Sequence, residues 1–160
     1  MTRVVRARLM SAKPPFAPDY PDMTSTEYPA RQDSVAQAIE DLKKSNWCRD
    51  AGQDLMSSLE IVLAEALNNV VEHSCTDMAE VWFRLLCDFE GQTVSIRIED
   101  NGRPMPGNAL PKGLAPILSV AKNDLPEGGF GWFLIRSICS EVNYARSGSI
   151  NRLELKLQDP

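Results

Sequence analysis

The chain has 160 residues, the usual length of one domain, and its 43% hydrophobic and 24% charged residues are the composition of an ordinary globular protein. No stretch approaches the roughly 18 uninterrupted apolar residues that a membrane-spanning helix needs, so we do not expect a membrane protein. The net charge of −5 gives no broad electrostatic attraction to nucleic acid, which argues against direct nucleic-acid binding.

The first part of the chain differs in composition from the rest. Residues 1–22 carry four basic residues followed by four prolines, and such a segment cannot bury a core. We therefore expect these residues to form a flexible arm, and residues 23–160 to form a single folded domain.

Two helices dominate the first half of that domain. After a short strand over Thr24–Tyr28, the spacing of apolar residues predicts helices over Arg31–Trp47 and about Gln53–His73. The second helix carries a regular apolar stripe, which consists of Leu55, Leu59, Val62, Leu63, Ala66 and Val70.

The period of hydrophobicity then changes to two, as in strands. Glu80–Glu90 alternates apolar and polar residues, and Glu90-Gly91-Gln92 predicts a turn. In the strand that follows, Val94, Ile96 and Ile98 share one face. The pattern predicts a hairpin with one buried face.

A long connection follows this hairpin. Asn101–Gly129 is rich in proline and glycine, and loops of this length are usually functional lids or disordered segments. A weak helical pattern lies within it at Leu114–Val120. Beyond it we expect a helix over about Phe130–Ser140 and a hairpin that pairs Glu141–Arg146 with Asn151–Leu157.

These elements predict the fold class. Antiparallel hairpins with one apolar face need helices to cover that face. The expected fold is therefore α+β, a two-layer sandwich of a mostly antiparallel sheet with helices on one face. A Rossmann fold is excluded, because no strand–helix–strand repeat carries a G-x-G-x-x-G motif.

Cysteine and histidine content limits the chemistry. None of the four cysteines forms a C-x-x-C pair, which favours reduced thiols in the core of a cytoplasmic protein. The single histidine, His73, excludes a histidine-rich metal site. A catalytic triad is poorly supported, because the sequence has no G-x-S-x-G motif.

Two places with carboxylate and amide side chains could carry chemistry. On the second helix, Glu65 and Asn69 lie one turn apart and about 40° apart around the axis, whereas Asn68 points well away from Glu65. Asp100 continues the buried face of its strand and is followed by Asn101-Gly102. Taken alone, the first is a common surface pair, and the second is an aspartate that ends a strand and begins a turn.

A third place is the segment Gly128-Gly129-Phe130-Gly131, directly before a helix. Glycines let the backbone approach a ligand closely, and the free N–H groups at a helix start bind anions. No Gly-Lys-Ser/Thr follows, so this is not a Walker A loop. Taken alone, a glycine-rich turn before a helix is also an ordinary structural feature.

The order of these motifs resembles a known family. A Glu-x-x-x-Asn helix, an Asp-x-Gly strand end, a long loop and a Gly-Gly-x-Gly helix start are similar to the ATP-binding fold shared by gyrases, Hsp90 chaperones, histidine kinases and MutL, the GHKL or Bergerat fold. The similarity is greatest to bacterial anti-sigma-factor serine/threonine kinases and covers about Thr24–Leu157. It rests on four blocks, Leu63–His73 (LAEALNNVVEH), Glu99–Pro106 (EDNGRPMP), Glu127–Ile135 (EGGFGWFLI) and Asn151–Leu153 (NRL).

The resemblance implies roles for two residues of the helix. Glu65 would be the general base that takes the proton from a serine hydroxyl of a protein substrate, and Asn69 the ligand of Mg²⁺ that presents the ATP phosphates. The prolines, glycines and poor hydrophobic pattern of the loop, about Arg103–Gly128, predict that it is unpacked in the empty protein, and contacts with the phosphates would order it.

The resemblance also implies how ATP is held. Asp100 would accept the amino group of adenine, and Gly102 would leave room for the base. The glycines of the third place, Gly128, Gly129 and Gly131, would lie at the phosphates.

The function that the resemblance implies is that of an ATP-dependent serine protein kinase and anti-sigma factor, a homodimer that binds a sigma factor and phosphorylates an antagonist protein of the STAS class. Two alternatives stay open: a kinase of a STAS partner without any sigma factor, and an ATP-binding module that has lost transfer. A histidine kinase domain is disfavoured, because the one histidine, His73, lies on the ATP-site helix.

Overall fold

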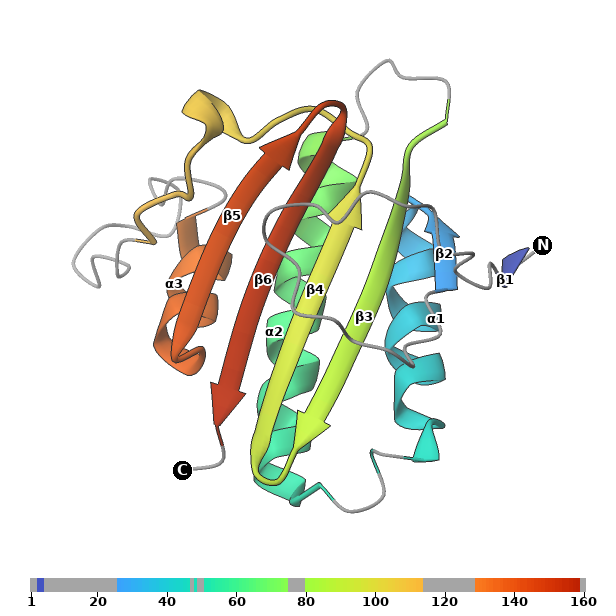
Figure 1. The fold of residues 1–160 in the computed structure, drawn as a ribbon, viewed down its shortest axis with the longest axis vertical. Coiled ribbons are helices and arrows are strands. Elements are labelled where there is room, and N and C mark those ends of the chain that lie inside the picture. The colour runs from blue at the N-terminus through green and yellow to red at the C-terminus, as the bar shows by residue number, and fades with distance from the viewer. Residues whose placement is uncertain are drawn as a thin grey trace, which may run out of the picture.

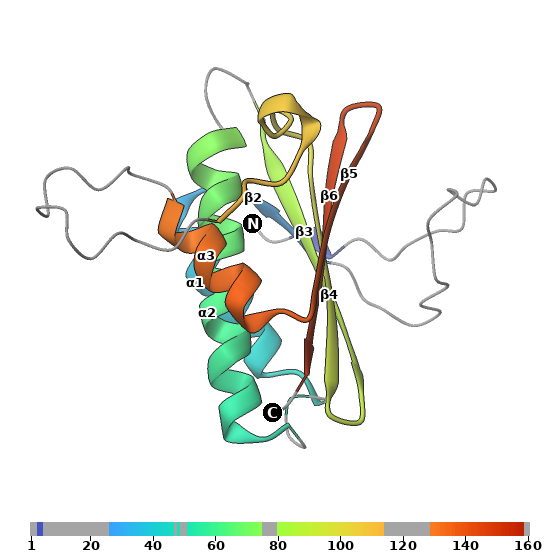
Figure 2. The same cartoon turned by 90° about the vertical axis from the view of Figure 1, so that its left-hand side faces the viewer.

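The computed structural model describes residues 3–4, 26–46, 48, 51–74, 80–113 and 129–158. These residues form a six-stranded antiparallel sheet in the order β1-β2-β3-β4-β6-β5, with helices packed against one of its faces (Figures 1 and 2). The helices are α1 (Gln32–Lys43), α2 (Gln53–Ser74) and α3 (Gly129–Ile138), with a short 3₁₀ helix, η2 (Pro106–Asn108). The strands are β1 (Arg3–Val4), β2 (Thr26–Pro29), β3 (Trp82–Glu90), β4 (Thr93–Asp100), β5 (Glu141–Ser147) and β6 (Ile150–Gln158).

This architecture confirms the predicted α+β sandwich. The three helices and the strands from β2 onward lie where the hydrophobic periods placed them, within a few residues at each end. Among the described residues, none of the helices combines the length and apolar character that crossing a bilayer requires.

The core lies between the helices and the inner face of the sheet. All six residues of the predicted α2 stripe are buried, and Leu67 joins them. The strands contribute their alternate residues, so that Phe83 from β3 and Ile98 from β4 are almost completely buried. α2 lies behind the middle of the sheet (Figure 1). Its buried face packs in the core, and this packing fixes the helix that carries Glu65 and Asn69.

The edge of the sheet differs from the prediction. Arg3 and Val4, in the segment expected to be a flexible arm, form the two-residue strand β1, which pairs with β2 through Arg3↔Glu27 and Val4↔Thr26. Backbone pairing at a strand edge needs no hydrophobic pattern, so composition gave no sign of it. The remaining residues of the arm lie outside the described residues.

The first part of the long loop also differs. The sequence predicts an unpacked loop, but residues 103–113, although mostly exposed, are anchored at several points. Met105 and Leu110 lie against the core, the Met105 N–H donates to Tyr144 Oη at 3.1 Å, and Arg136 Nε donates to the Pro111 carbonyl at 3.0 Å. Polar contacts from β5 and α3 hold a segment that has little apolar content. The rest of the loop, including the weak helical pattern at Leu114–Val120 and Gly128, lies outside the described residues.

Candidate functional site

α2 directs Glu65 toward α3. The Glu65 side chain is half-buried and lies against Gly131, so that a Cβ atom added to Gly131 would lie 3.4 Å from Glu65 Cδ and would collide with Glu65 Oε2. The missing side chain of Gly131 is therefore what lets the carboxylate occupy the space between the two helices. Two residues that the sequence analysis assigned to the same site are thus in contact.

Asn69 lies one turn after Glu65 and is held by the helix itself. Its Nδ2 donates to the Glu65 backbone carbonyl at 2.8 Å, which fixes the orientation of the amide. The amide oxygen, Oδ1, takes no part in this hydrogen bond. An oxygen of this kind suits Mg²⁺ as a ligand. The neighbouring Asn68 instead accepts a hydrogen bond from Gln32 Nε2 of α1 at 3.0 Å, which confirms that it points away from Glu65.

Asp100 lies at the end of the buried face of β4, as predicted. Its side chain is only 6% exposed, and in the sheet it stands between Phe83 of β3 and Asn151 of β6. Asp100 Oδ1 accepts the Gly102 N–H at 2.9 Å and Asn151 Nδ2 at 2.8 Å. These donors satisfy a buried carboxylate that would otherwise be costly, and they hold it in one orientation.

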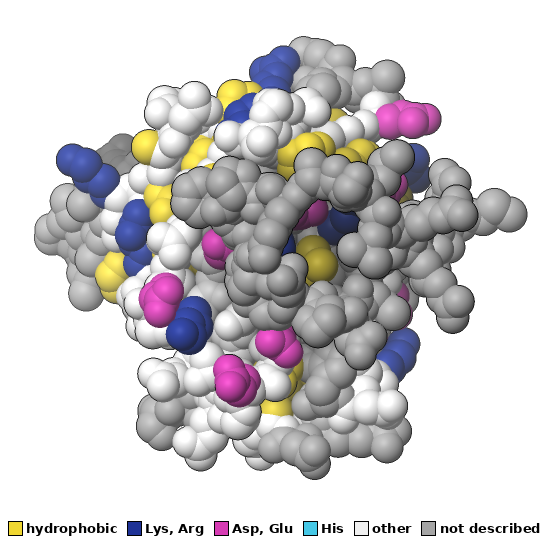
Figure 3. All heavy atoms as spheres, in the orientation of Figure 1, with side chains coloured by type: hydrophobic (Ala, Val, Ile, Leu, Met, Phe, Trp, Pro, Cys, Tyr) yellow, Lys and Arg dark blue, Asp and Glu magenta, His cyan; other side chains and the backbone are white. Residues whose placement is uncertain are grey.

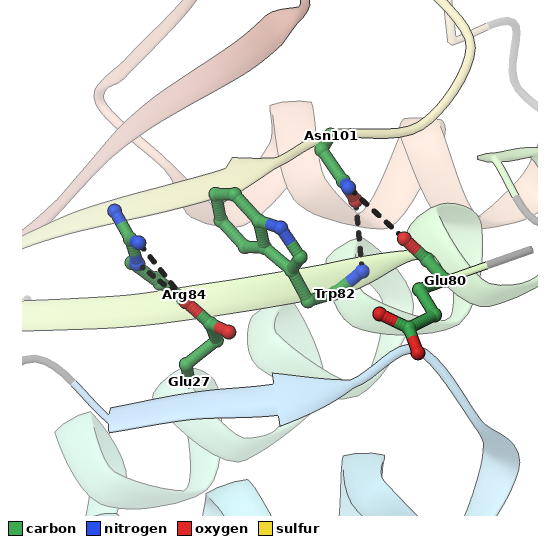
Figure 4. Close-up of polar contacts among 5 residues, drawn as sticks. All are labelled: Glu27, Glu80, Trp82, Arg84 and Asn101. Atoms are coloured by element: carbon green, nitrogen blue, oxygen red, sulfur yellow. Dashed lines mark hydrogen bonds and ion pairs between the residues drawn. The ribbon is translucent and has the colours of Figure 1, made fainter. Parts of the chain in front are cut away.

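Asn101, between Asp100 and Gly102, ties the end of β4 to the neighbouring strand β3 (Figure 4). Its Oδ1 accepts the Trp82 N–H at 2.8 Å and its Nδ2 donates to the Glu80 carbonyl at 3.0 Å, so the side chain joins the end of β4 to the start of β3. Both polar groups of the amide are used within the sheet. We conclude that Asn101 supports the turn and is not a ligand-binding residue.

The glycine segment lies partly within the described residues. Gly129 is the first residue of α3, and Gly131, two residues later, is the glycine that contacts Glu65. Gly128 lies outside the described residues. Gly113, at the end of the anchored loop, adopts a φ of +61° and lies so close to α3 that a Cβ there would come 2.8 Å from the Trp132 carbonyl oxygen. The loop after Gly102 therefore runs from the strand end to α3.

Figures 1 and 2 place the C-terminal part of α2, the tip of β4 and η2 at the same end of the sandwich. The predicted site residues form two groups. Glu65, Asn69 and Gly131 make one, between α2 and α3. Asp100 and Gly102 make the other, at the mouth of the core, and residues 103–113 connect the two.

The sequence analysis missed the residues that support Asp100. Asn151 of β6 is 4% exposed, and it is bonded to Asp100, Tyr144 and Arg146. The block Asn151–Leu153 was noted as part of the resemblance without a role. The β4–β6 pairing places Asn151 directly opposite Asp100, and the pattern of neither strand alone reveals this pairing.

The residues of the two groups defined above do not lie on the outer face of the sheet, which is the face away from the helices. In Figure 3, which views this face, basic and acidic side chains lie beside one another, and Arg84 also stacks 4.4 Å from the centre of the Trp82 ring. Opposite charges are paired across neighbouring strands, so the described part of this face has no field of a single sign. The pairs are Arg84–Glu27, Arg97–Glu154 and Arg152–Glu99, each at 2.9 Å.

Comparison with known proteins agrees with this geometry. The family model described as "Histidine kinase-like ATPase domain" matches residues 28–157. The serine-protein kinase RsbW of Staphylococcus epidermidis is 33% identical over 101 residues, which cover 61% of this chain and 64% of the relative. The serine/threonine-protein kinase BtrW of Bordetella bronchiseptica is 32% identical over 102 residues, which cover 63% of this chain and 69% of the relative. The match thus spans less than two thirds of the RsbW chain.

A solved structure shares the fold. The histidine kinase domain of the blue-light activated histidine kinase EL346 from Erythrobacter litoralis superposes with a TM-score of 0.51 over 79% of this chain and 58% of its own, at 17% identity. At that identity the likeness concerns the arrangement of helices and strands.

Proposed function

The chain belongs to the family of histidine kinase-like ATPase domains, and from this premise we propose that it is an ATP-dependent serine protein kinase of the anti-sigma-factor type. The observation that carries the proposal is the contact of Glu65 with Gly131, with Asn69 one helical turn after Glu65, together with the buried carboxylate of Asp100 at the end of β4. The half-buried position of the Glu65 carboxylate against Gly131 favours a kinase over a module that only binds nucleotide. The names of the relatives, both protein kinases, support the same reading.

We assign adenine recognition to Asp100 and Gly102. The carboxylate, held by the Gly102 N–H and Asn151, is an acceptor and suits the exocyclic amino group of adenine, which is a donor. Gly102 presents no side chain at the turn and leaves room for the base. A guanine would bring a carbonyl oxygen to the same place, and two acceptors would face each other.

We assign the binding of the phosphates and Mg²⁺ to the group between α2 and α3, which contains Asn69 and Gly131. Asn69 offers one amide oxygen, and the described residues contain no cluster of three or more acidic, histidine or cysteine side chains that could enclose a metal. This fits Mg²⁺, which is usually held by one or two protein oxygens together with waters and substrate phosphates. Gly128, Gly129 and Gly131 would let the start of α3 approach the phosphates.

Glu65 is proposed as the general base. Phosphoryl transfer depends mainly on positioning and on charge neutralisation, and the protein supplies a group that accepts the proton of the attacking hydroxyl. Glu65 reaches the region beside Asn69 from one turn away, so the proton acceptor and the metal ligand come from one rigid helix. Such a base contributes roughly 10²–10⁴-fold to the rate.

We further propose that the substrate is a serine of a STAS-class antagonist protein, that a sigma factor is the second partner, and that the active form is a homodimer. These partners follow from the resemblance to anti-sigma-factor kinases. A kinase that serves a STAS partner without any sigma factor would use the same site.

The direct test is to incubate the chain with γ-labelled ATP, Mg²⁺ and the STAS-domain protein encoded beside it. We expect acid-stable label on a serine of the STAS protein and no label when Mg²⁺ is chelated. Acid-labile label on the chain itself would contradict the proposal, because it would indicate phosphohistidine at His73 and hence a different class of kinase.

A further inference from the structure

The β5–β6 hairpin carries a hydrogen-bonded group next to the proposed adenine site. Asn151 is nearly inaccessible to solvent, and its Nδ2 donates to Asp100 Oδ1 and to the Arg103 carbonyl, both at 2.8 Å. One amide group thus touches the carboxylate and the backbone just beyond Gly102. The turn that would face adenine is tied to β6 through a single side chain.

Two residues of β5 decide which way this amide points. Tyr144 Oη donates to Asn151 Oδ1 at 2.8 Å, and Arg146 Nη1 donates to the same oxygen. A guanidinium has only donors, so the group facing Arg146 has to be the amide oxygen. The NH₂ group is then directed to Asp100.

The hydroxyl of Tyr144 has a fixed direction as well. It accepts the Met105 N–H at 3.1 Å, so its own hydrogen is left for Asn151. Arg146 Nη1 also donates to the Gly102 carbonyl at 3.1 Å. Both donors of β5 therefore point at the Asn151 amide oxygen, and the Asn151 NH₂ group points at the Asp100 carboxylate.

We propose that Tyr144, Arg146 and Asn151 are positioning residues that set the selectivity of Asp100 for the amino group of adenine; the inference rests on the proposed function. With Asn151 Nδ2 directed at it, Asp100 stays an acceptor and is held facing one way. Arg146 and Tyr144 both donate to Asn151 Oδ1, so without Arg146 the amide keeps only one of these two donors and its NH₂ group is held less firmly against the carboxylate. The orientation of Asp100 is then less fixed, which weakens the distinction between a purine that bears the amino group and one that lacks it.

The experiment compares two ligands, ATP and purine riboside triphosphate, which is ATP without the amino group. Calorimetry on the whole chain with Mg²⁺ should show that the wild type prefers ATP on the order of tenfold or more, as expected for a hydrogen bond to a charged group. Asn151→Ala should lose most of this preference, because ATP affinity falls while affinity for the analogue stays nearly constant. Arg146→Met and Tyr144→Phe, which each remove one of the two donors to the Asn151 amide oxygen, should each lose part of it.

The control is Arg152→Met, which removes an arginine of the same hairpin that is paired with Glu99 on the outer face; the preference should persist. Arg146→Lys restores a donor and should recover part of the preference, and it carries the test if Arg146→Met does not fold. A preference that persists in Arg146→Met and Asn151→Ala, or an equal loss of affinity for both ligands, would overturn the inference and leave the kinase proposal intact. A wild type that binds neither triphosphate, or binds both equally, would instead overturn the assignment of adenine to Asp100, and this inference with it.

Discussion

Asn68 and Asn69 are adjacent amides with different partners, Gln32 of α1 and the backbone of α2 itself, and this allows a matched pair of variants. Asn69→Ala removes the proposed Mg²⁺ ligand, so nucleotide binding should lose most of its dependence on Mg²⁺. Asn68→Ala removes only the hydrogen bond to Gln32 and should keep that dependence, with a loss of stability of about 0.5–1.5 kcal/mol. Titration of nucleotide with and without Mg²⁺ checks both. Equal Mg²⁺ dependence in the two variants would remove Asn69 from the metal site.

Gly131 offers a test of the contact between α2 and α3. In Gly131→Ala the new methyl group meets the end of the flexible Glu65 side chain, which can turn aside at little cost. Alanine is also preferred to glycine within a helix by roughly 0.5–1 kcal/mol, so the free energy of unfolding should hardly fall. Transfer should nevertheless slow, because the carboxylate is displaced. Urea unfolding together with single-turnover transfer separates the two effects, and normal transfer by this variant would show that the position of Glu65 is unimportant.

The buried cysteines predict how the protein responds to alkali. Burial raises the pKa of the Cys139 thiol from its ordinary 9.0 to about 12, and burial also raises the pKa of Cys87. The folded state therefore favours the protonated thiols. Their contribution to stability is complete below pH 9 and is lost as the pH rises toward 12. At pH 8 these two thiols should resist a disulfide reagent in the native protein and react once urea unfolds it; rapid reaction of both in the native state would contradict their burial.

At the scale of the elements, hydrophobic period was sufficient to predict most of the fold. The 3.6-residue period of α2 placed Glu65 and Asn69 on one edge, and the two-residue period of β4 placed Asp100 on the buried face. Both placements are local properties of one segment. Asn151 was different, because its role depends on how β6 pairs with β4, and a side chain that bonds across strands leaves no periodic mark in its own strand. The anchoring of residues 103–113 was missed for the same reason: its anchors, Tyr144 and Arg136, lie far along the chain.

The anchored loop gives a prediction for amide exchange. The Met105 N–H donates to Tyr144, and the Asn108 N–H donates to the Met105 carbonyl at 2.9 Å within the loop. In the nucleotide-free protein, Tyr144→Phe should speed exchange of the Met105 amide while the Asn108 amide, whose acceptor is unchanged, keeps its rate. Residue-resolved hydrogen exchange by NMR measures both. A Met105 amide that exchanges at the same rate in wild type and variant would show that the hydroxyl does not hold the loop.

At the scale of the whole molecule, the two layers have different tasks. The strands carry paired charges on the outer face and the core on the inner face. The residues proposed for chemistry lie on the facing sides of α2 and α3 and at the tip of β4. The rigid α2 connects the core to these residues, so Glu65 and Asn69 are held by the same packing that stabilises the fold.

The measurement that tests the account most directly is single-turnover phosphoryl transfer by Glu65→Gln to the STAS-class partner, made alongside ATP binding by calorimetry. Glutamine keeps the size of the side chain beside Gly131 and removes only its ability to accept a proton. The account predicts that ATP and partner binding stay close to wild type while transfer falls by roughly 10²–10⁴-fold. Transfer at the wild-type rate by a variant that binds ATP normally would contradict it, because Glu65 would then have no part in the chemistry.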